Sequence, residues 1–298
     1  TQMKEQFKKK FSNDLSKSLL TTLARYFPPI KFNEALIDIV NVLMDGLSRG
    51  DVYINIKEIP NNIELKYTGW PSYHIKALLE SGWTKGDKSP IVLNGDLISW
   101  RRTHNEIVET IQKFLLRNQP INQLSKELPI RINSKNLEHL NIQQKKAVNL
   151  VQSEQIILLS GGPGSGKTST ILQMLLQALT RNPNLKIAMA APTGKAAKKL
   201  KDTIQVGIKN FEDPIKDKLS KIPSKTLHKW LEAGPNGFRR NSQRLLKLDL
   251  IVIDEMSMVD LSTINGLLDS LPKSCQIILV GDPDQLLPIG SGGIWQIL

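Results

Sequence analysis

The sequence predicts an α/β fold: a parallel sheet covered by helices, preceded by a smaller mixed α/β domain. Two observations predict this arrangement. In the second half, four short apolar runs alternate with longer helical or polar stretches. Each run is apolar throughout, which is typical of parallel strands buried on both faces. The runs are "IILL" at 156–159, "IAMAA" at 187–191, "LIVI" at 250–253 and "IILV" at 277–280.

The first third predicts helices and a small β element. Apolar residues recur every three or four positions in 14–27 and 34–48, which is the period of an amphipathic helix. "RGDVYINI" predicts a short strand, and "SPIVLNGDLISWRR" predicts a hairpin around Asn94, Gly95 and Asp96, because Asn and Gly tolerate positive φ. The stretch "THNEIVETIQKFLLRN" predicts a helix with Thr103 as its N-cap.

A domain boundary is predicted after this helix. The stretch from Asn118 to Asn136 contains two prolines and little sustained periodicity. We therefore expect a first domain over 1–118, a linker over 119–136 and a second domain over 137–298.

Charge and cysteine content limit which kinds of binding partner and which cellular compartment are expected. The 298 residues contain 40 Lys and Arg against 28 Asp and Glu, a net charge of +12, which favours a polyanion such as nucleic acid. Simple solubility is the alternative explanation. The one cysteine, Cys275, excludes an internal disulfide and a cysteine-rich metal site, and we expect it to be a buried thiol. With neither a signal-peptide pattern nor a membrane-length apolar run, a cytoplasmic location is predicted.

The stretch "GGPGSGKTST" matches the phosphate-binding loop pattern, with Gly161, four residues, and then Gly-Lys-Thr. An apolar strand precedes it and a helix follows, as that motif requires. Lys167 is expected to reach the β and γ phosphates of ATP, and the Thr168 hydroxyl to bind Mg²⁺. The alternative is a glycine-rich turn that binds nothing. The predicted nucleotide contacts are Gly162, Pro163, Gly164, Ser165, Gly166, Lys167, Thr168 and Ser169.

Two further strands carry polar side chains to the same edge of the predicted sheet. "LIVIDEMSMVD" ends a buried strand with Asp254, expected to hold Mg²⁺, and Glu255, expected to orient or deprotonate the attacking water. A solvated pair of acids at a strand end is the alternative. "ILVGDPDQ" ends a third strand, from which the Gln285 amide is expected to detect the γ phosphate.

Most of the positive charge lies between these motifs. Residues 194–248 contain 14 Lys and Arg against 5 Asp and Glu, a balance of +9. Phosphates of single-stranded DNA are the natural counter-charge. For 205–224, a solvated helix face or a flexible insert is the alternative.

Together these motifs resemble superfamily 1 DNA helicases. "GGPGSGKTST", "APTGKAAKKL", "KTLHKWL", "IVIDEMSMVD" and "LVGDPDQLLPIGSGGIW" are similar to motifs I, Ia, Ib, II and III, in that order. "LNIQQKKAV" resembles the segment that reads adenine, with Gln144 at the reading position. Within the superfamily, "TLHKWL" followed by "LDLIVIDEMSMVDLSTINGLLDSLP" resembles the RecD family, the alpha subunits of exodeoxyribonuclease V.

The resemblance implies a RecA-like P-loop motor domain that hydrolyses ATP with Mg²⁺ and moves 5′ to 3′ along single-stranded DNA. Thr193 and Lys195 match one segment that touches the DNA backbone, and Thr226 and His228 match the next. The first domain would dock a RecC-like subunit, in a heterotrimer with a RecB-like subunit that repairs double-strand breaks. A stand-alone helicase, or a nucleotide-binding assembly module without turnover, stays open.

The chain departs from the helicase pattern in one respect. Such helicases have a second RecA-like domain whose arginine reaches the γ phosphate, and no candidate for it follows "GSGGIW". The sequence therefore resembles an N-terminal fragment with the first motor domain only, not competent to translocate alone.

Overall fold

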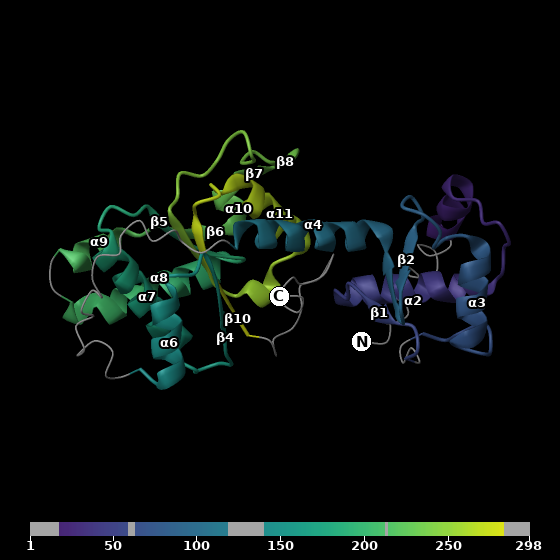
Figure 1. Cartoon of the computed structure of the whole chain (residues 1–298), viewed down its shortest axis with the longest axis horizontal. Coiled ribbons are helices and arrows are strands. Elements are labelled where there is room, and N and C mark those ends of the chain that lie inside the picture. Colours follow the sequence, from purple (N-terminus) through teal and green to yellow (C-terminus); the bar gives the residue numbers. More distant parts are fainter. Residues whose placement is uncertain (1–17, 59–62, 119–139, 212–213, 283–298) are drawn as a thin grey trace, which may run out of the picture. The chain divides into compact units, whose positions relative to one another are not determined.

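The computed structural model describes residues 18–58, 63–118, 140–211 and 214–282 (Figure 1). These residues divide into two compact units, with the division at Val108. The first unit contains 18–58 and 63–108, and the second contains the rest. The linker predicted over 119–136 lies outside the described residues, so the three-part division stays a prediction.

The first unit combines helices with a small antiparallel sheet of order β1-β3-β2. Its core is formed by apolar side chains such as Leu36, Ile39, Leu78, Trp83 and Ile98. Residues 18–26 are helical, and the other elements are α2 (Ala35–Arg49), β1 (Ile54–Asn55), α3 (Ser72–Ser81), β2 (Ile91–Asn94), β3 (Leu97–Trp100) and the start of α4 (Arg101–Arg117).

The predicted hairpin is confirmed, but the predicted N-cap of the next helix is wrong. β2 and β3 pair from Asn94 with Leu97, and Gly95 in the turn has a φ of 58°. α4 begins at Arg101, directly after β3, and not beyond Thr103. The Arg101 backbone N–H donates to Pro90 O at 2.8 Å, and its guanidinium donates to Ser89 O at 3.1 Å. These bonds hold the first turn against the hairpin, so Thr103 lies inside the helix and is buried.

The second unit is built on a five-stranded parallel sheet of order β4-β10-β9-β5-β6. All four apolar runs named above form strands, which confirms the predicted fold class. The fifth strand, β6, is short and polar and lies at the edge. The strands are β4 (Ile156–Ser160), β5 (Ile187–Ala191), β6 (Ser224–Thr226), β9 (Leu250–Ile253) and β10 (Gln276–Gly281).

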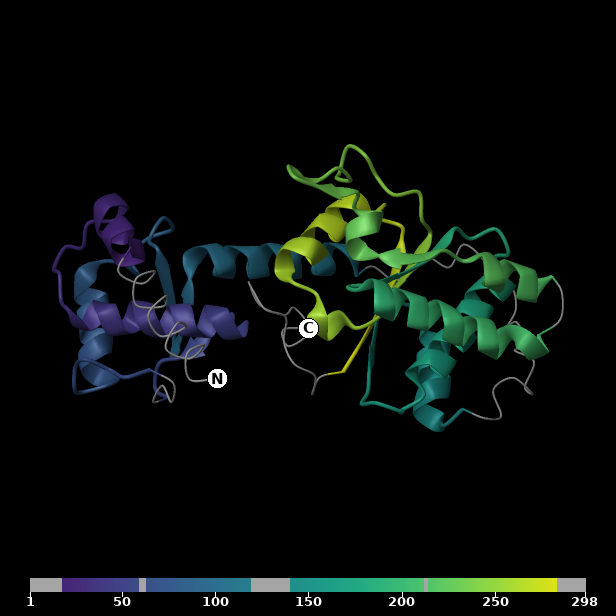
Figure 2. The same ribbon diagram turned by 180° about the vertical axis from the view of Figure 1, so that it is seen from behind.

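Helices cover both faces of this sheet (Figures 1 and 2). One face packs against α6, α7, α8 and α9 through side chains such as Met189, Val252 and Ile278. The other lies against α10, α11 and the last residues of α4. The helices are α6 (Ile142–Leu150), α7 (Lys167–Arg181), α8 (Gly194–Gly207), α9 (Ile215–Lys221), α10 (Leu227–Trp230) and α11 (Leu261–Ser270). The unit also contains two 3₁₀ turns, η1 (Ile208–Asn210) and η2 (Met256–Met258), and a hairpin formed by β7 (Ala233–Gly234) and β8 (Gly237–Phe238).

The lone cysteine is buried, as predicted. Cys275 lies directly before β10 with no exposed surface, and burial raises the pKa of its thiol to about 12. A thiol that holds its proton so firmly is a packing group and not a nucleophile.

Candidate nucleotide and nucleic-acid site

Three strands bring the predicted nucleotide residues to one edge of the sheet. β10 lies between β4 and β9, and all three run in the same direction. The loop after β4 begins with Gly161, whose N–H donates to Gly281 O at the end of β10, at 3.2 Å. The N–H of Asp254, directly after β9, donates to Ala190 O of β5 at 2.9 Å. The phosphate loop and the acid pair therefore share the carboxyl edge, where ligands of parallel α/β sheets bind.

The phosphate loop has a backbone conformation that favours glycine at two positions. Gly164 and Gly166 have φ angles of 74° and 78°, in the left-handed region. A Cβ on Gly166 would also lie 2.5 Å from Nε2 of Gln144. A Cβ on Gly161 would lie 2.6 Å from Oγ of Ser165. The loop is thus tightly curled and leads directly into α7, whose first backbone N–H groups are not used within the helix and suit an anion.

Lys167, the first residue of α7, folds its side chain back over this loop. Its ammonium donates to Gly162 O at 2.8 Å and also to Gly161 O. The positive charge is therefore held at the mouth of the loop and not extended into solvent. That is the position from which a lysine reaches nucleotide phosphates.

Gln144 joins α6 to the phosphate loop. Its Oε1 accepts from the Asn141 N–H at 2.9 Å while the Asn141 side chain accepts from the Gln144 N–H at 2.8 Å, a reciprocal capping box. Its Nε2 donates to Ser165 O at 3.1 Å. Both ends of the amide are engaged by protein, so a contact with adenine would have to replace or share these bonds.

Asp254 and Glu255 form an acid pair at the end of β9. The Glu255 N–H donates to Oδ1 of Asp254 at 2.8 Å, and Glu255 itself has a φ of 54°, so the backbone turns sharply there. Burial raises the pKa of the Asp254 carboxyl, against the lowering effects of that hydrogen bond and of the Lys167 and Lys199 charges. Burial and then the charge of Asp254 raise the pKa of Glu255, which Lys199 opposes.

This donor set suits a magnesium ion shared with a nucleotide. Within the described ranges no group of three or more His, Cys, Asp or Glu could hold a metal by itself. Magnesium is commonly held by one or two protein oxygens together with phosphates and waters. Thr168 and Asp254, beside the phosphate loop, provide such a partial set, and a divalent cation would offset the cost of burying the Asp254 carboxylate.

The third strand delivers Gly281 to the same edge. Gly281 is the last residue of β10, and Asp282 follows it with a buried side chain. Gln285, expected to detect the γ phosphate, lies outside the described residues.

The residues predicted to contact DNA lie at the neighbouring strand ends. Thr193 is the N-cap of α8, with its side chain accepting from the Ala196 N–H at 3.1 Å, and Lys195 is exposed in the first turn. Thr226 ends β6 and caps α10, where it accepts from the Lys229 N–H at 3.2 Å. Ala191 and Thr226 are register partners in β5 and β6, so both caps lie at the same edge.

His228 and Trp230 differ in exposure. The His228 side chain is exposed and its ring meets Phe238 edge-on, with centroids 6.1 Å apart. The Trp230 indole is half-buried and donates to Met189 O at 3.0 Å, so it packs against β5. Lys225 lies 4.8 Å above the Trp230 ring. The exposed groups at this corner are therefore the cationic and imidazole side chains.

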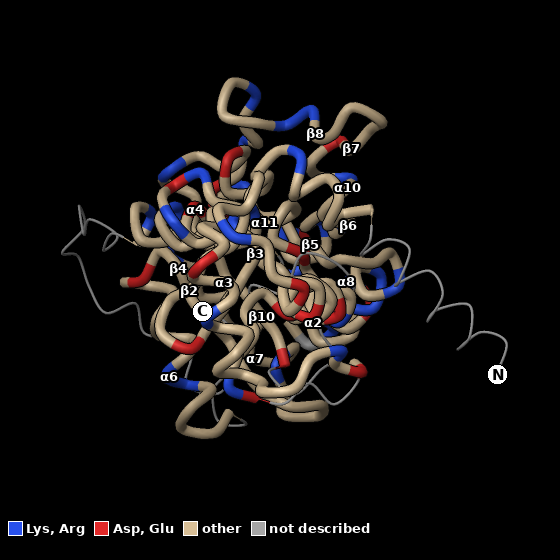
Figure 3. The backbone as a smooth tube through the Cα atoms, turned by 90° about the vertical axis from the view of Figure 1, so that its right-hand side faces the viewer, with Lys and Arg blue, Asp and Glu red and all other residues tan. Residues whose placement is uncertain are grey.

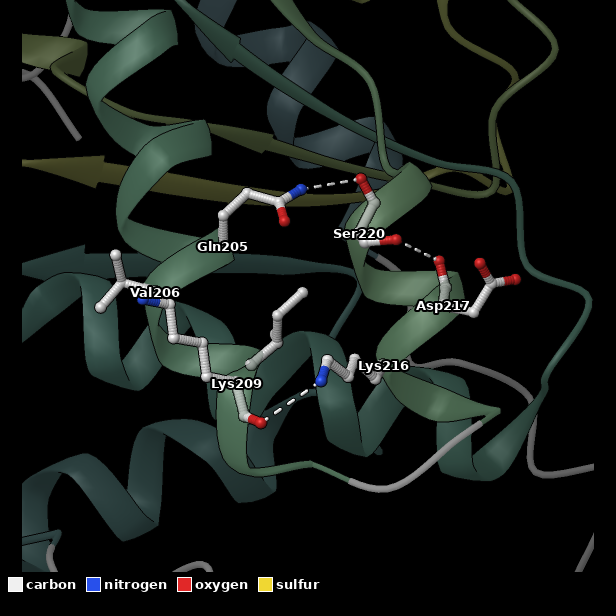
Figure 4. A pocket seen from close by; sticks show the side chains of 7 residues that line it. Gln205, Val206, Lys209, Lys216, Asp217 and Ser220 are labelled. Atoms are coloured by element: carbon white, nitrogen blue, oxygen red, sulfur yellow. Dashed lines mark hydrogen bonds between the residues drawn. The ribbon is translucent and has the colours of Figure 1, made fainter.

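The fold divides the basic stretch between two edges of the sheet. α8 carries the chain from the carboxyl edge at Thr193 to the amino edge at Gly207, and α9 ends three residues before β6 begins. Lys and Arg positions along α8 and near the β7–β8 hairpin are blue in Figure 3. Two lysines near α9, Lys209 and Lys216, instead line a surface pocket of about 450 Å³ at the amino edge, together with Ser220 (Figure 4). Lys195, in the first turn of α8, lies at the carboxyl edge, where the nucleotide site also lies.

Sequence reasoning missed two residues of this site. Asn141 holds Gln144 in place, and the spacing of a capping residue with Gln three positions later is a readable signal in "LNIQQ". Lys199 is close enough to Asp254 and Glu255 to lower the pKa of both. The sequence signal that could have pointed to Lys199 is its position four residues after Lys195, because residues four apart are neighbours on a helix surface.

Comparison with known proteins identifies relatives of this chain. The model of an AAA domain family matches residues 144–291. The RecBCD enzyme subunit RecD of Mycolicibacterium smegmatis is 30% identical over 264 residues, which cover 86% of this chain and 47% of that protein. The RecBCD enzyme subunit RecD of Buchnera aphidicola is 32% identical over 255 residues, covering 80% of this chain and 40% of that protein.

The chain belongs to the RecD family.

Similarity to the RecD family extends beyond the motor motifs into the first unit, since both alignments cover at least 80% of the chain. The ATP-dependent RecD2 DNA helicase of Deinococcus radiodurans is 31% identical over 153 residues, covering 51% of this chain and 19% of that protein. The chain thus spans less than half the length of these curated RecD relatives. Across the described residues, no helix has the length and apolar character needed to cross a membrane.

Proposed function

We propose that the complete protein is an ATP-driven DNA helicase and translocase, and that this chain carries the nucleotide-binding half of its motor. The observation that carries the proposal is the meeting of the phosphate loop, Lys167 and the Asp254–Glu255 pair at one sheet edge, beside the caps at Thr193 and Thr226. Membership of the RecD family supports it.

Each group at this edge has a role that suits ATP hydrolysis. The loop amides and Lys167 would hold the phosphates, while Thr168 and Asp254 would hold Mg²⁺. The bound metal would neutralise charge on the phosphate oxygens. Glu255 is partly buried beside a second acid, which raises its pKa and suits it to accept a proton from the attacking water. Gln144 would favour adenine from the start of α6.

We propose a RecC-like and a RecB-like subunit as partners in an exodeoxyribonuclease V complex of the cytoplasm that processes double-strand breaks. The first unit exposes a set of large apolar side chains, and an apolar surface of this kind commonly marks a protein interface. They are Tyr26, Phe27, Ile30, Phe32 and Tyr73. Movement 5′ to 3′ is part of the same proposal and rests on the family alone.

A stand-alone helicase is the second candidate, favoured by the similarity to a RecD2 DNA helicase. That alignment covers 51% of the chain, whereas the RecD subunits of Mycolicibacterium smegmatis and Buchnera aphidicola align over 86% and 80% of it, which favours the subunit. Purification of the complete protein from its own cells separates the two. The protein is expected to co-purify with two large subunits in equal amounts. A protein recovered without other subunits would favour the stand-alone enzyme.

Strand separation by the complete protein tests the proposed activity. A duplex with a single-stranded 5′ tail should be unwound in the presence of ATP and Mg²⁺, and the same duplex with a 3′ tail should not. Lys167→Ala should abolish unwinding of the 5′-tailed duplex. Unwinding of the 3′-tailed duplex alone would overturn the polarity, and activity that persists in Lys167→Ala would overturn the site.

A further inference from the structure

The side-chain amide of Gln144 is held in one orientation by protein groups at both of its ends. Oε1 accepts from the Asn141 N–H at 2.9 Å, and Nε2 donates to Ser165 O at 3.1 Å. The opposite orientation would place Nε2 against the Asn141 N–H and Oε1 against Ser165 O, so that donor would meet donor and acceptor would meet acceptor. The order of donor and acceptor along this amide is therefore fixed before a ligand binds.

Each end of the amide keeps hydrogen-bonding capacity for a ligand. An amide oxygen accepts two hydrogen bonds and an amide nitrogen donates two, and the bonds to Asn141 and Ser165 use one of each. Glutamine can pair with adenine because adenine offers N7 as an acceptor and its 6-amino group as a donor. Guanine has an oxygen in place of that amino group, which would face Oε1 without a proton. The orientation of Gln144 therefore sets which base is accepted.

One of the two groups that fix this orientation belongs to the phosphate loop. Ser165 lies between two glycines of left-handed backbone, Gly164 and Gly166, and its own N–H donates to Gly162 O at 3.3 Å within the loop. A Cβ on Gly166 would lie 2.5 Å from Nε2 of Gln144, so the amide lies directly against the loop backbone. The position of Ser165 O therefore depends on the conformation of the loop.

The peptide between Ser165 and Gly166 connects Gln144 to the expected phosphate position. A trans peptide is planar, and its C=O and N–H point in opposite directions. The oxygen of this peptide accepts from Gln144, and its N–H belongs to Gly166, the N-cap of α7. N–H groups at a helix start have no partner within the helix and suit a phosphate. A phosphate bound there would fix the peptide plane, and with it the carbonyl that orients Gln144.

We propose that the Ser165–Gly166 peptide determines base specificity, because it holds Gln144 in the orientation that selects adenine when the loop holds phosphates. This inference rests on the function proposed above. Adenine is then preferred over guanine more strongly in a diphosphate than in a monophosphate, which lacks the β phosphate that the loop would hold. Linkage requires the converse: the β phosphate adds more to the affinity of an adenine ligand than to that of a guanine ligand.

The test compares the affinities of this 298-residue chain for ADP, GDP, AMP and GMP, measured by competition with a fluorescent ADP analogue in the presence of Mg²⁺. The ADP:GDP affinity ratio should exceed the AMP:GMP ratio by at least about five-fold. Equal ratios in a wild-type chain that binds ADP would overturn the inference. Absence of ADP binding by the wild-type chain would overturn the proposed function itself.

Gln144→Glu separates base selection from helix capping. A glutamate at this position still accepts from the Asn141 N–H and so keeps the capping box, but it has no donor for Ser165 O. The ADP:GDP ratio of this variant should fall to within about two-fold of its AMP:GMP ratio. Thermal unfolding at the wild-type temperature would show that its fold is intact.

Gln143→Ala is the matched control, because Gln143 is the exposed neighbour of Gln144 on the same helix. This variant should keep the wild-type difference between the two ratios. A difference that persists in Gln144→Glu, or that is lost equally in Gln143→Ala, would assign base selection to other groups and overturn the inference.

Discussion

Glu255 is the residue on which the proposed chemistry depends most. It follows a buried strand, has a positive φ and shares its surroundings with Asp254. Glu255→Gln keeps the shape and hydrogen-bonding capacity of the side chain but removes its ability to accept a proton. In the complete protein, this change should lower the rate of DNA-stimulated ATP hydrolysis by about 10²–10⁴-fold.

Binding provides the control for this variant. Nucleotide affinity of Glu255→Gln should stay within about two-fold of wild type, because Lys167 and the loop are unchanged. A variant that hydrolyses ATP at the wild-type rate would show that another group accepts the proton.

Gln144 is predicted to read adenine, and its present contacts allow that role to be separated from helix capping. Gln144→Ala and Asn141→Ala both break the capping box, and each should lower the free energy of unfolding by about 1 kcal/mol. Only Gln144→Ala also removes an amide from the phosphate loop. Its preference for ADP over GDP should fall, whereas Asn141→Ala should keep that preference. Equal preferences in the two variants, measured by titration calorimetry, would assign Gln144 to capping alone.

For the nucleotide site, the sequence predicted which residue types are present and at which edge of the sheet they lie, but not their contacts. The loop pattern and the acids after a buried strand were sufficient to bring Lys167 and Asp254 to one edge. The bond from Gln144 to Ser165 O depends on where α6 packs, and the influence of Lys199 depends on the rotation of α8. Neither is encoded by a local pattern.

Among the elements, the end of α4 is attached to α11 by one buried side chain. Arg117 is 8% exposed and donates to Pro272 O at 2.8 Å, to Leu271 O at 2.7 Å and to Leu268 O. These carbonyls include the end of α11, where backbone acceptors lack partners within the helix. One guanidinium thus completes the turn that leads to β10.

Arg117→Ala should therefore destabilise the second unit. Loss of the donor leaves buried carbonyls without partners, which should cost about 3 kcal/mol in the free energy of unfolding. Lys113→Ala, on the same helix, removes ion pairs with Glu109 and Asp269 that lie nearer the surface and should cost at most about 1 kcal/mol. Denaturant unfolding measures both, and equal losses would contradict the role assigned to Arg117.

The elements that escaped prediction share a physical cause. β6 consists of Ser224, Lys225 and Thr226 and has no apolar run, because it is an edge strand held by pairing with β5 alone. α4 starts two residues before its expected cap because contacts with the hairpin replace a capping side chain. Strands buried on both faces could be predicted because their sequences are apolar throughout. The edge strand and the helix start could not, because pairing with β5 defines the first and contacts with the hairpin define the second.

For the molecule as a whole, the fold assigns different roles to lysines that are close in sequence. Lys195 lies at the carboxyl edge beside the nucleotide site, and Lys221 lies at the amino edge, paired with Asp217 at 2.6 Å. In this chain, Lys195→Ala should weaken oligonucleotide binding and reduce the slope of log affinity against log salt by about 0.7. Lys221→Ala should leave that slope unchanged. A titration over a range of salt concentrations in which both variants behave alike would contradict the division of the basic stretch.

The decisive measurement is titration calorimetry of this 298-residue chain with ADP in the presence of Mg²⁺, for wild type and Lys167→Ala. One nucleotide should bind per chain, and the variant should bind at least about ten-fold more weakly, because a charge-assisted bond to phosphate is lost. Equal affinity of the two proteins, or no binding by wild type, would contradict the assignment of this sheet edge as a nucleotide site.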